Sequence, residues 1–189
     1  MSLRFIPNLI CLLRIALVYP VAHGILQGHY PQVLLLFAIA AASDALDGFL
    51  AKHFGWRTEL GKVLDPLADK LLLVSVFICL SYAGLAPWWL AALVLLRDLV
   101  IFFGALTFKW LFGPLRGAPT AASKFNTFWQ IVFCLAAVAQ AAFGIPGDPG
   151  VIALGAMAMV TTAVSGIDYT LIYSRRAVAV TRERAAAAA

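Results

Sequence analysis

Four aspartates lie close together in a chain that is otherwise poor in charge. Asp44, Asp47, Asp65 and Asp69 fall between positions 44 and 69, although the whole chain has only nine acidic residues. On helices the first two would share a face, and so would the last two, because residues three or four apart are neighbours on a helix surface. Two carboxylates about 6 Å apart repel by roughly 3 kcal/mol at an effective dielectric of 20. The carboxylates must therefore take up protons, pair with cations or bind metal ions.

Two kinds of positive charge could compensate these carboxylates. Mg²⁺ and Mn²⁺ prefer carboxylate oxygens and are often held together with substrate phosphates. Four carboxylates offset two divalent ions in formal charge, so we predict two bound ions, either Mg²⁺ or Mn²⁺. The alternative is a network of ion pairs with the nearby Lys52, Lys62 and Lys70.

The elements that carry the aspartates are predicted to be membrane helices. The chain has 189 residues, of which 63% are hydrophobic and 12% charged, whereas a soluble domain is about half apolar and a quarter charged. This composition excludes an ordinary soluble fold and intrinsic disorder. Six apolar runs are each long enough to cross a hydrocarbon core of about 30 Å. They cover residues 7–26, 31–51, 63–82, 88–112, 122–143 and 151–173.

We therefore expect an all-α integral membrane protein with six transmembrane helices. Residues 1–174 would form a single domain. Residues 175–189 would form a basic, alanine-rich cytoplasmic tail, frayed from Arg182 onward.

The basic residues predict the orientation in the membrane. The turns at residues 28–31, 83–87 and 144–150 contain no Lys or Arg, whereas the other two connections and both ends of the chain are basic. With six spans all basic segments fall on one side, and the positive-inside rule places that side, with both termini, in the cytoplasm. The aspartates would then lie just inside the cytoplasmic boundary. Charge spread along a membrane face argues against nucleic-acid binding.

Further charged residues interrupt the apolar runs. We predict that Arg97 and Lys124 form a cationic pocket for the phosphate of an acceptor, with an interhelical ion pair as the alternative for each. For Arg14 and Asp168 we favour interhelical ion pairs. Arg97 and Asp98 are adjacent and should point different ways on a helix, so each would need another partner.

The aspartates belong to a longer pattern with fixed spacing. The stretch reads Asp44-x2-Asp47-Gly48-x2-Ala51-Lys52-x8-Gly61-x3-Asp65-x3-Asp69. It resembles the signature of the CDP-alcohol phosphatidyltransferases, D-x2-D-G-x2-A-R-x8-G-x3-D-x3-D, and departs from it only at Lys52, where the family has Arg. Lys keeps the charge but loses the bidentate fork of Arg, so we expect weaker CDP binding rather than lost activity.

The resemblance implies an activity and a role for each signature residue. The family moves a phosphatidyl group from a CDP-linked donor to an alcohol and releases CMP, in an active site that opens to the cytoplasm. Asp44, Asp47 and Asp65 would hold two divalent ions with Asp69 close by, and Asp69 would be the catalytic base. Residues implied in the CDP pocket are Asp47, Gly48, Ala51, Lys52 and Gly61. The resemblance also implies a homodimer, and we expect a bacterial inner membrane.

Outside the signature, other segments resemble the glycerol-accepting branch of this family. They are residues 97–101, 119–130, 161–165 and 166–169. Within that branch they are most similar to cardiolipin synthases of the eukaryotic type and to phosphatidylglycerophosphate synthases. The resemblance implies CDP-diacylglycerol as donor and phosphatidylglycerol as acceptor, with glycerol 3-phosphate as the alternative acceptor. The non-enzymatic alternatives are a divalent-cation transporter and a membrane scaffold.

Overall fold

The computed structural model describes residues 6–54, 61–113 and 120–187; within these ranges, the side chains of residues 6–8, 44–54, 61–66, 109, 112 and 183–187 lie outside the description. All regular structure in the described part is helical. The six helices are α1 (Ile6–Leu26), α2 (Tyr30–Phe54), α3 (Gly61–Tyr82), α4 (Trp88–Phe112), α5 (Ala121–Phe143) and α6 (Asp148–Ala187).

Each apolar run is thus a helix, and the predicted all-α class is confirmed. Most helix ends lie within three residues of the prediction, but α6 continues from the expected end near Tyr173 to Ala187. The added segment has no Gly or Pro and is rich in Ala and Arg, which are strong helix formers. The expectation of a frayed end from Arg182 was therefore wrong for the backbone up to Ala187.

Four helices are long and apolar enough to cross a membrane in the part of the chain that is described. The spans are Leu9–Leu26 in α1, Trp88–Phe108 in α4, Ala121–Phe143 in α5 and Asp148–Arg182 in α6. In α2 the described apolar stretch is Tyr30–Ser43, which is shorter than a span. The chain is therefore an integral membrane protein, and the count of six spanning helices stays a prediction.

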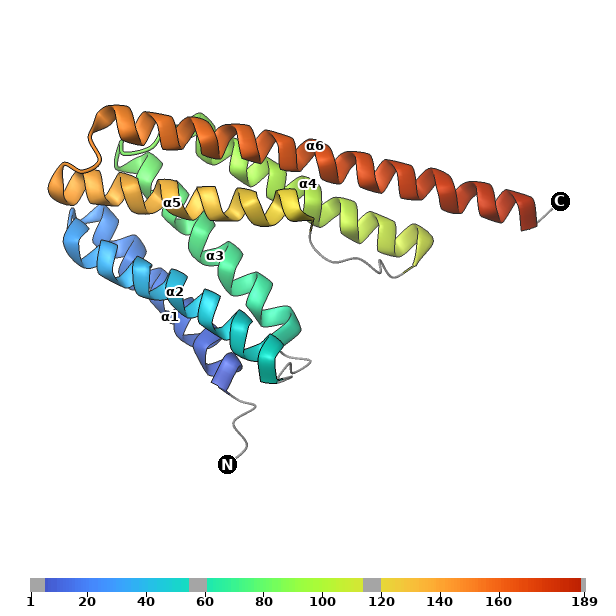
Figure 1. Ribbon diagram of the computed structural model, residues 1–189, viewed down its shortest axis with the longest axis horizontal. Helices are drawn as coiled ribbons and strands as arrows, with labels where there is room; N and C mark the ends of the chain where they lie inside the picture. Colours follow the sequence, from blue (N-terminus) through green and yellow to red (C-terminus); the bar gives the residue numbers. More distant parts are fainter. Residues whose placement is uncertain (1–5, 55–60, 114–119, 188–189) are drawn as a thin grey trace.

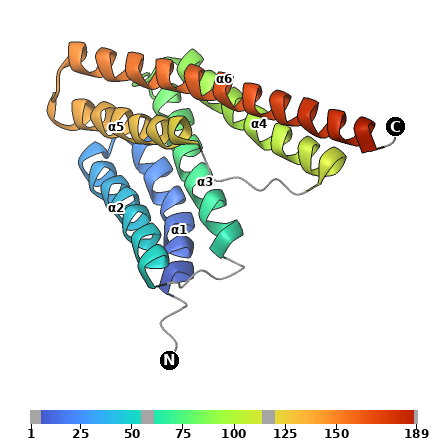
Figure 2. The same cartoon turned by 45° about the vertical axis from the view of Figure 1, so that its right-hand side comes forward.

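The helices form two groups, which are joined by α5 and by the contact of α3 with α4. α1 packs against both α2 and α3, and lies between them in Figure 2. α6 packs along α4 and α5, while α5 also contacts α2 and α3. At 40 residues, α6 is about 60 Å long, and its last turns extend beyond the other helices (Figure 1).

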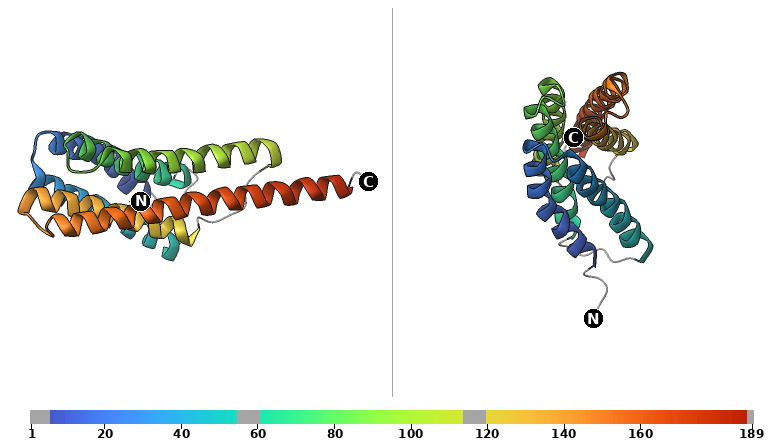
Figure 3. Two further views of the ribbon diagram at one scale, coloured as in Figure 1. Left: turned by 90° about the horizontal axis from the view of Figure 1, so that it is seen from above. Right: turned by 90° about the vertical axis from the view of Figure 1, so that its left-hand side faces the viewer.

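The three turns without Lys or Arg gather at one end of the molecule. They join α1 to α2, α3 to α4, and α5 to α6 (Figures 1 and 3). In the last of these, Gly144 ends α5 in the left-handed conformation with φ 72°, which only glycine adopts without strain. Gln140 then accepts from the Gly147 amide at 2.7 Å and donates to Asp148 at 3.0 Å. The turn is thus closed by neutral hydrogen bonds and one carboxylate.

Gly104 allows α4 and α6 to approach closely. A Cβ built at this position would lie 2.8 Å from the ring of Tyr173 on α6. That ring also meets Phe108, with centroids 6.5 Å apart, and Tyr169, with centroids 5.7 Å apart. Because the ring is held by aromatic neighbours, it has little room to yield to an added methyl group.

We expect Gly104→Ala to destabilise the protein in detergent. Overpacking typically lowers the free energy of unfolding by about 1–3 kcal/mol, whereas the better helix propensity of Ala raises it by about 1 kcal/mol. The free energy of unfolding should therefore fall by up to about 2 kcal/mol. The measurement is the shift in Tm. Gly166→Ala is a matched control, because its Cβ would make an ordinary contact of 3.6 Å with Arg97. Equal Tm values for the two variants would contradict the close approach.

Candidate active site

The signature residues lie on two helices. Asp44 and Asp47 stand one turn apart near the end of α2, and Asp65 and Asp69 stand one turn apart near the start of α3. These two helix ends lie at the same end of the molecule, near the start of α1 (Figure 1). Only Asp69 among the four has a described side chain. The other signature side chains, of Asp44, Asp47, Ala51, Lys52 and Asp65, lie outside the description, as do the surroundings of Gly48 and Gly61.

Asp69 is held by an arginine from the neighbouring helix. The Nη1 group of Arg14, on α1, donates to Oδ1 of Asp69. The Arg14 side chain is 1% exposed, whereas Asp69 is 39% exposed. This pair confirms the interpretation of Arg14 as one member of an interhelical ion pair. It also fixes the position of the predicted base while leaving that carboxylate accessible.

Asp168 behaves differently from Arg14. It is half-buried on α6, and it forms no ion pair with any side chain that the structure describes. The expected interhelical pair is therefore not found there.

Arg97 lies in the interior of the bundle. It is 5% exposed. Its Nη2 group donates to Ser123 Oγ on α5 and to Ser165 Oγ on α6, both at 2.6 Å. Its Nη1 group donates to Asp98 Oδ1 at 2.7 Å. The guanidinium carbon lies 5.9 Å from the centre of the Tyr169 ring. The Arg97 guanidinium thus connects α4 to α5 and α6 through hydrogen bonds.

The expectation that Arg97 and Asp98 point different ways was wrong. Their Cα atoms are adjacent on α4, but the long Arg side chain curves back so that its guanidinium reaches the neighbouring carboxylate. Asp98 also accepts from Lys70 Nζ of α3 at 2.5 Å. A single carboxylate is therefore shared by two cations, and the three charged groups together carry a formal charge of +1.

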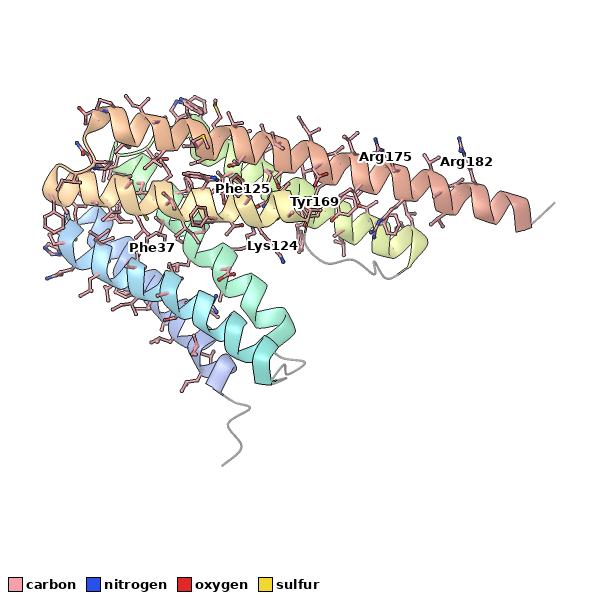
Figure 4. The ribbon with its side chains drawn as sticks, viewed as in Figure 1. Phe37, Lys124, Phe125, Tyr169, Arg175 and Arg182 are labelled. Atoms are coloured by element: carbon pink, nitrogen blue, oxygen red, sulfur yellow. The ribbon has the colours of Figure 1, made fainter. Side chains whose placement is uncertain are left out.

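Lys124 does not join this cluster. Its side chain is exposed and points away from α6 (Figure 4), and the described residues offer it no ion-pair partner. Its neighbour Ser123 is the residue that turns toward Arg97. The structure places the two predicted acceptor-binding cations on adjacent parts of α5 and α4, but with only Arg97 buried.

Sequence reasoning missed the polar residues that surround Arg97. The sequence indicates Lys70 only as a counter-ion for the aspartates, and Ser123, Ser165 and Tyr169 lie in the segments that resemble the glycerol-accepting branch. The signal that could have found them is the spacing of Ser165 and Tyr169, four residues apart on one face of α6. Tyr169 also reaches the start of α5, where its hydroxyl accepts from the Thr120 amide at 3.4 Å.

A second polar cluster ties α5 to α6 one turn away from Arg97. Asn126 Oδ1 accepts from Thr162 Oγ1 at 2.8 Å and from Thr161 Oγ1 at 3.1 Å. Gln130 Nε2 donates to Thr162 Oγ1 at 3.1 Å. Asn126, Gln130 and Thr162 are fully buried. Hydrogen bonds between membrane helices contribute about 0.6 kcal/mol each on average, so this cluster holds the helices together without supplying a charged group.

The donor set on α2 and α3 suits a hard divalent cation. It consists of carboxylate oxygens, which Mg²⁺ and Mn²⁺ prefer, and the one described member is partly exposed rather than sealed in the core. Among the described side chains no group of three metal-binding residues is found. The fit therefore depends on the chemistry of the aspartates and their helical spacing.

The fold and the site first define a class. A bundle of apolar helices, four of them long enough to cross a membrane, is an integral membrane protein, and this one carries aspartates near the end of α2 and the start of α3. Comparison with protein families then gives a specific result, because the family model described as CDP-alcohol phosphatidyltransferase matches residues 4–168. The chain belongs to the CDP-alcohol phosphatidyltransferase family. This match sets aside the cation transporter and the scaffold.

Individual relatives are named as two kinds of enzyme. A human cardiolipin synthase (CMP-forming) is 30% identical over 94% of this chain and 64% of its own length. A probable phosphatidylglycerophosphate synthase of Mycobacterium tuberculosis is 35% identical over 86% of this chain and 78% of its own length. A chloroplastic CDP-diacylglycerol–glycerol-3-phosphate 3-phosphatidyltransferase of rice is 31% identical over 90% of this chain and 59% of its own length. The chain thus spans just under two thirds of the human relative.

Proposed function

We propose that this protein transfers a phosphatidyl group from CDP-diacylglycerol to a glycerol-type acceptor and releases CMP. The observation that carries the proposal is the family match over residues 4–168, which includes the whole signature from Asp44 to Asp69. The relatives in this range are named for such transfers.

Phosphatidylglycerol is the proposed acceptor, which makes the product cardiolipin. It is favoured by the resemblance of α4 to α6 to cardiolipin synthases and by the human relative. Glycerol 3-phosphate is the second candidate, and the mycobacterial relative favours it through its higher identity and the larger matched share of its own length. Both acceptors present a phosphate and a primary hydroxyl, so one cationic pocket could accept either.

Two divalent ions, Mg²⁺ or Mn²⁺, are proposed to be held by Asp44, Asp47, Asp65 and Asp69. When bound, they would supply positive charge that stabilises the pyrophosphate oxygens during transfer. Asp47, Gly48, Ala51, Lys52 and Gly61 are proposed to line the CDP pocket, where the charge of Lys52 offsets phosphate.

Asp69 is proposed to take the proton from the attacking hydroxyl of the acceptor. A carboxylate acts as a base when the hydroxyl comes within hydrogen-bond reach. Arg14 supports this role, because it binds Oδ1 and restricts the movement of the carboxylate. The partial exposure of Asp69 supports access for the acceptor. Phosphoryl-type transfer depends mainly on placement and charge stabilisation, which are what these residues offer.

Six membrane crossings with both termini in the cytoplasm are also proposed. The 25 residues of α2 and the 22 residues of α3 give lengths of about 37 and 33 Å, enough for a core of about 30 Å. The gathering of the uncharged turns at one end supports this orientation. A bacterial inner membrane and a homodimer are part of the same proposal. Light scattering on the purified protein checks the homodimer.

The proposal is tested by CMP release from the purified full chain. The protein is given CDP-diacylglycerol with phosphatidylglycerol, with glycerol 3-phosphate, or with neither, and the lipid product is identified by mass spectrometry. Cardiolipin supports the first acceptor and phosphatidylglycerophosphate supports the second. Absence of CMP with both acceptors, from protein shown to be folded, would refute the proposed transfer.

Arg97→Lys is expected to weaken acceptor binding more than donor binding. Lys keeps the positive charge but cannot make the bonds that the Arg fork makes to Asp98, Ser123 and Ser165. We expect the KM for the acceptor to rise about tenfold, which corresponds to about 1.4 kcal/mol, while the KM for CDP-diacylglycerol changes less than twofold. Steady-state kinetics with each substrate varied in turn measures both values. A parallel rise in both would contradict the assignment of Arg97 to the acceptor.

A further inference from the structure

Asp98 is a buried carboxylate that two cations from different helices share. It is 12% exposed, and its Oδ1 atom accepts from Arg97 Nη1 at 2.7 Å and from Lys70 Nζ at 2.5 Å. Because α4 carries Asp98 and Arg97 while α3 carries Lys70, the carboxylate joins these two helices. It neutralises one of the two cations, so the three groups together keep one net positive charge.

The contacts of Arg97 fix the plane of its guanidinium. Nη1 is directed by Asp98, and Nη2 is directed by Ser123 and Ser165. The Tyr169 ring lies close to the guanidinium carbon. Asp98 is the only charged acceptor that the described residues give Arg97, and hydrogen bonds to charged groups are stronger than those to neutral hydroxyls. The Asp98 carboxylate is therefore the main determinant of the orientation of the Arg97 guanidinium.

Lys70 connects this cluster to the proposed base. Lys70 follows Asp69 directly on α3. Asp69 pairs with Arg14 of α1, whereas Lys70 pairs with Asp98 of α4. One turn of α3 is thus fixed on both sides by ion pairs. The position of Asp98 determines the position of Arg97 on one side and restrains the backbone of Asp69 on the other.

We propose that Asp98 is a positioning residue that aligns Arg97 with the acceptor phosphate. Through Lys70 it also keeps Arg97 at a fixed position relative to Asp69. The inference rests on the proposed function, because it takes Arg97 as the acceptor-binding cation. A residue that only joined α3 to α4 would support stability alone. A positioning residue has the further effect of setting the affinity for one substrate and not the other.

The test is the kinetics of Asp98→Asn, which keeps the size of the side chain and removes its charge. We expect the KM for the preferred acceptor to rise at least tenfold, with a change of less than twofold in the KM for CDP-diacylglycerol. Asp98→Glu restores the charge, so its acceptor KM should lie closer to that of the unmodified chain. Thr162→Val is the control for lost stability, because it removes fully buried hydrogen bonds between helices and should lower Tm without changing either KM.

A double variant separates positioning from independent binding. If Asp98 acts through Arg97, Asp98→Asn adds little to the acceptor KM once Arg97→Lys is present. Should Asp98→Asn fail to fold, Lys70→Met carries the test, because it removes the ion pair that links Asp98 to α3 and should raise the acceptor KM about threefold.

The outcomes are distinct. A multiplicative effect in the double variant, a parallel rise of both KM values, or an acceptor KM in Asp98→Asn equal to that of the unmodified chain overturns the positioning role while the transfer itself stands. If Lys70→Met replaces Asp98→Asn, an unchanged acceptor KM has the same meaning. If the unmodified chain releases no CMP with either acceptor, the proposed function fails, and the positioning role fails with it.

Discussion

Asp69→Asn is expected to lower CMP release by about 10²–10⁴-fold, the range that a positioned general base contributes. The amide has nearly the shape of the carboxylate but cannot take a proton from the acceptor hydroxyl. It also lacks the negative charge that a divalent ion would require. The measurement is the rate of CMP release at saturating CDP-diacylglycerol and acceptor.

The ion pair with Arg14 makes a control for folding necessary. Arg14 is 1% exposed, and removing one charge of a buried ion pair costs up to about 3–5 kcal/mol of stability. Asp69→Asn could therefore lose activity by unfolding. The double variant Arg14→Met, Asp69→Asn removes the buried cation as well, so we expect its Tm to recover while CMP release stays low. Recovery of turnover in the double variant, or normal turnover in Asp69→Asn, would disprove the role of Asp69 as base.

Removal of divalent ions is expected to reduce CMP release to background. Asp44, Asp47, Asp65 and Asp69 would then face a negatively charged pyrophosphate without the ions that offset both sets of charges. Excess EDTA followed by dialysis tests this, and added Mg²⁺ or Mn²⁺ should restore the rate.

A control separates loss of the ion from loss of the fold. Circular dichroism before and after chelation should show the same helix content. Full turnover in excess chelator would support the other source of compensation, ion pairs between the aspartates and the lysines at positions 52, 62 and 70.

The helices could be predicted from sequence because their cause is local. A run of apolar residues long enough for a bilayer is helical whatever its neighbours are, since the backbone must satisfy its own hydrogen bonds there. α4 begins and ends where the run does, at Trp88 and Phe112. The end of α6 was missed because the hydrophobic pattern stops near Tyr173, whereas helix propensity continues to Ala187.

The pairing of charges could be predicted only in part. An arginine inside an apolar run must have a partner, so the pair of Arg14 was foreseeable, but the choice of Asp69 depends on how α1 lies against α3. The pair of Arg97 with Asp98 was missed because an argument from helical faces ignores the reach of a long side chain.

The sequence by itself determined the membrane class, the helical segments, and the spacing that brings four aspartates onto two helix ends. These follow from composition and from the period of the helix, which are properties of neighbouring residues. Only the tertiary structure decided that Lys70, Arg97 and Asp98 share one carboxylate oxygen and that Ser123 and Ser165 hold the guanidinium. Those contacts join residues up to 68 positions apart, and they depend on the packing of four helices, which no local pattern encodes.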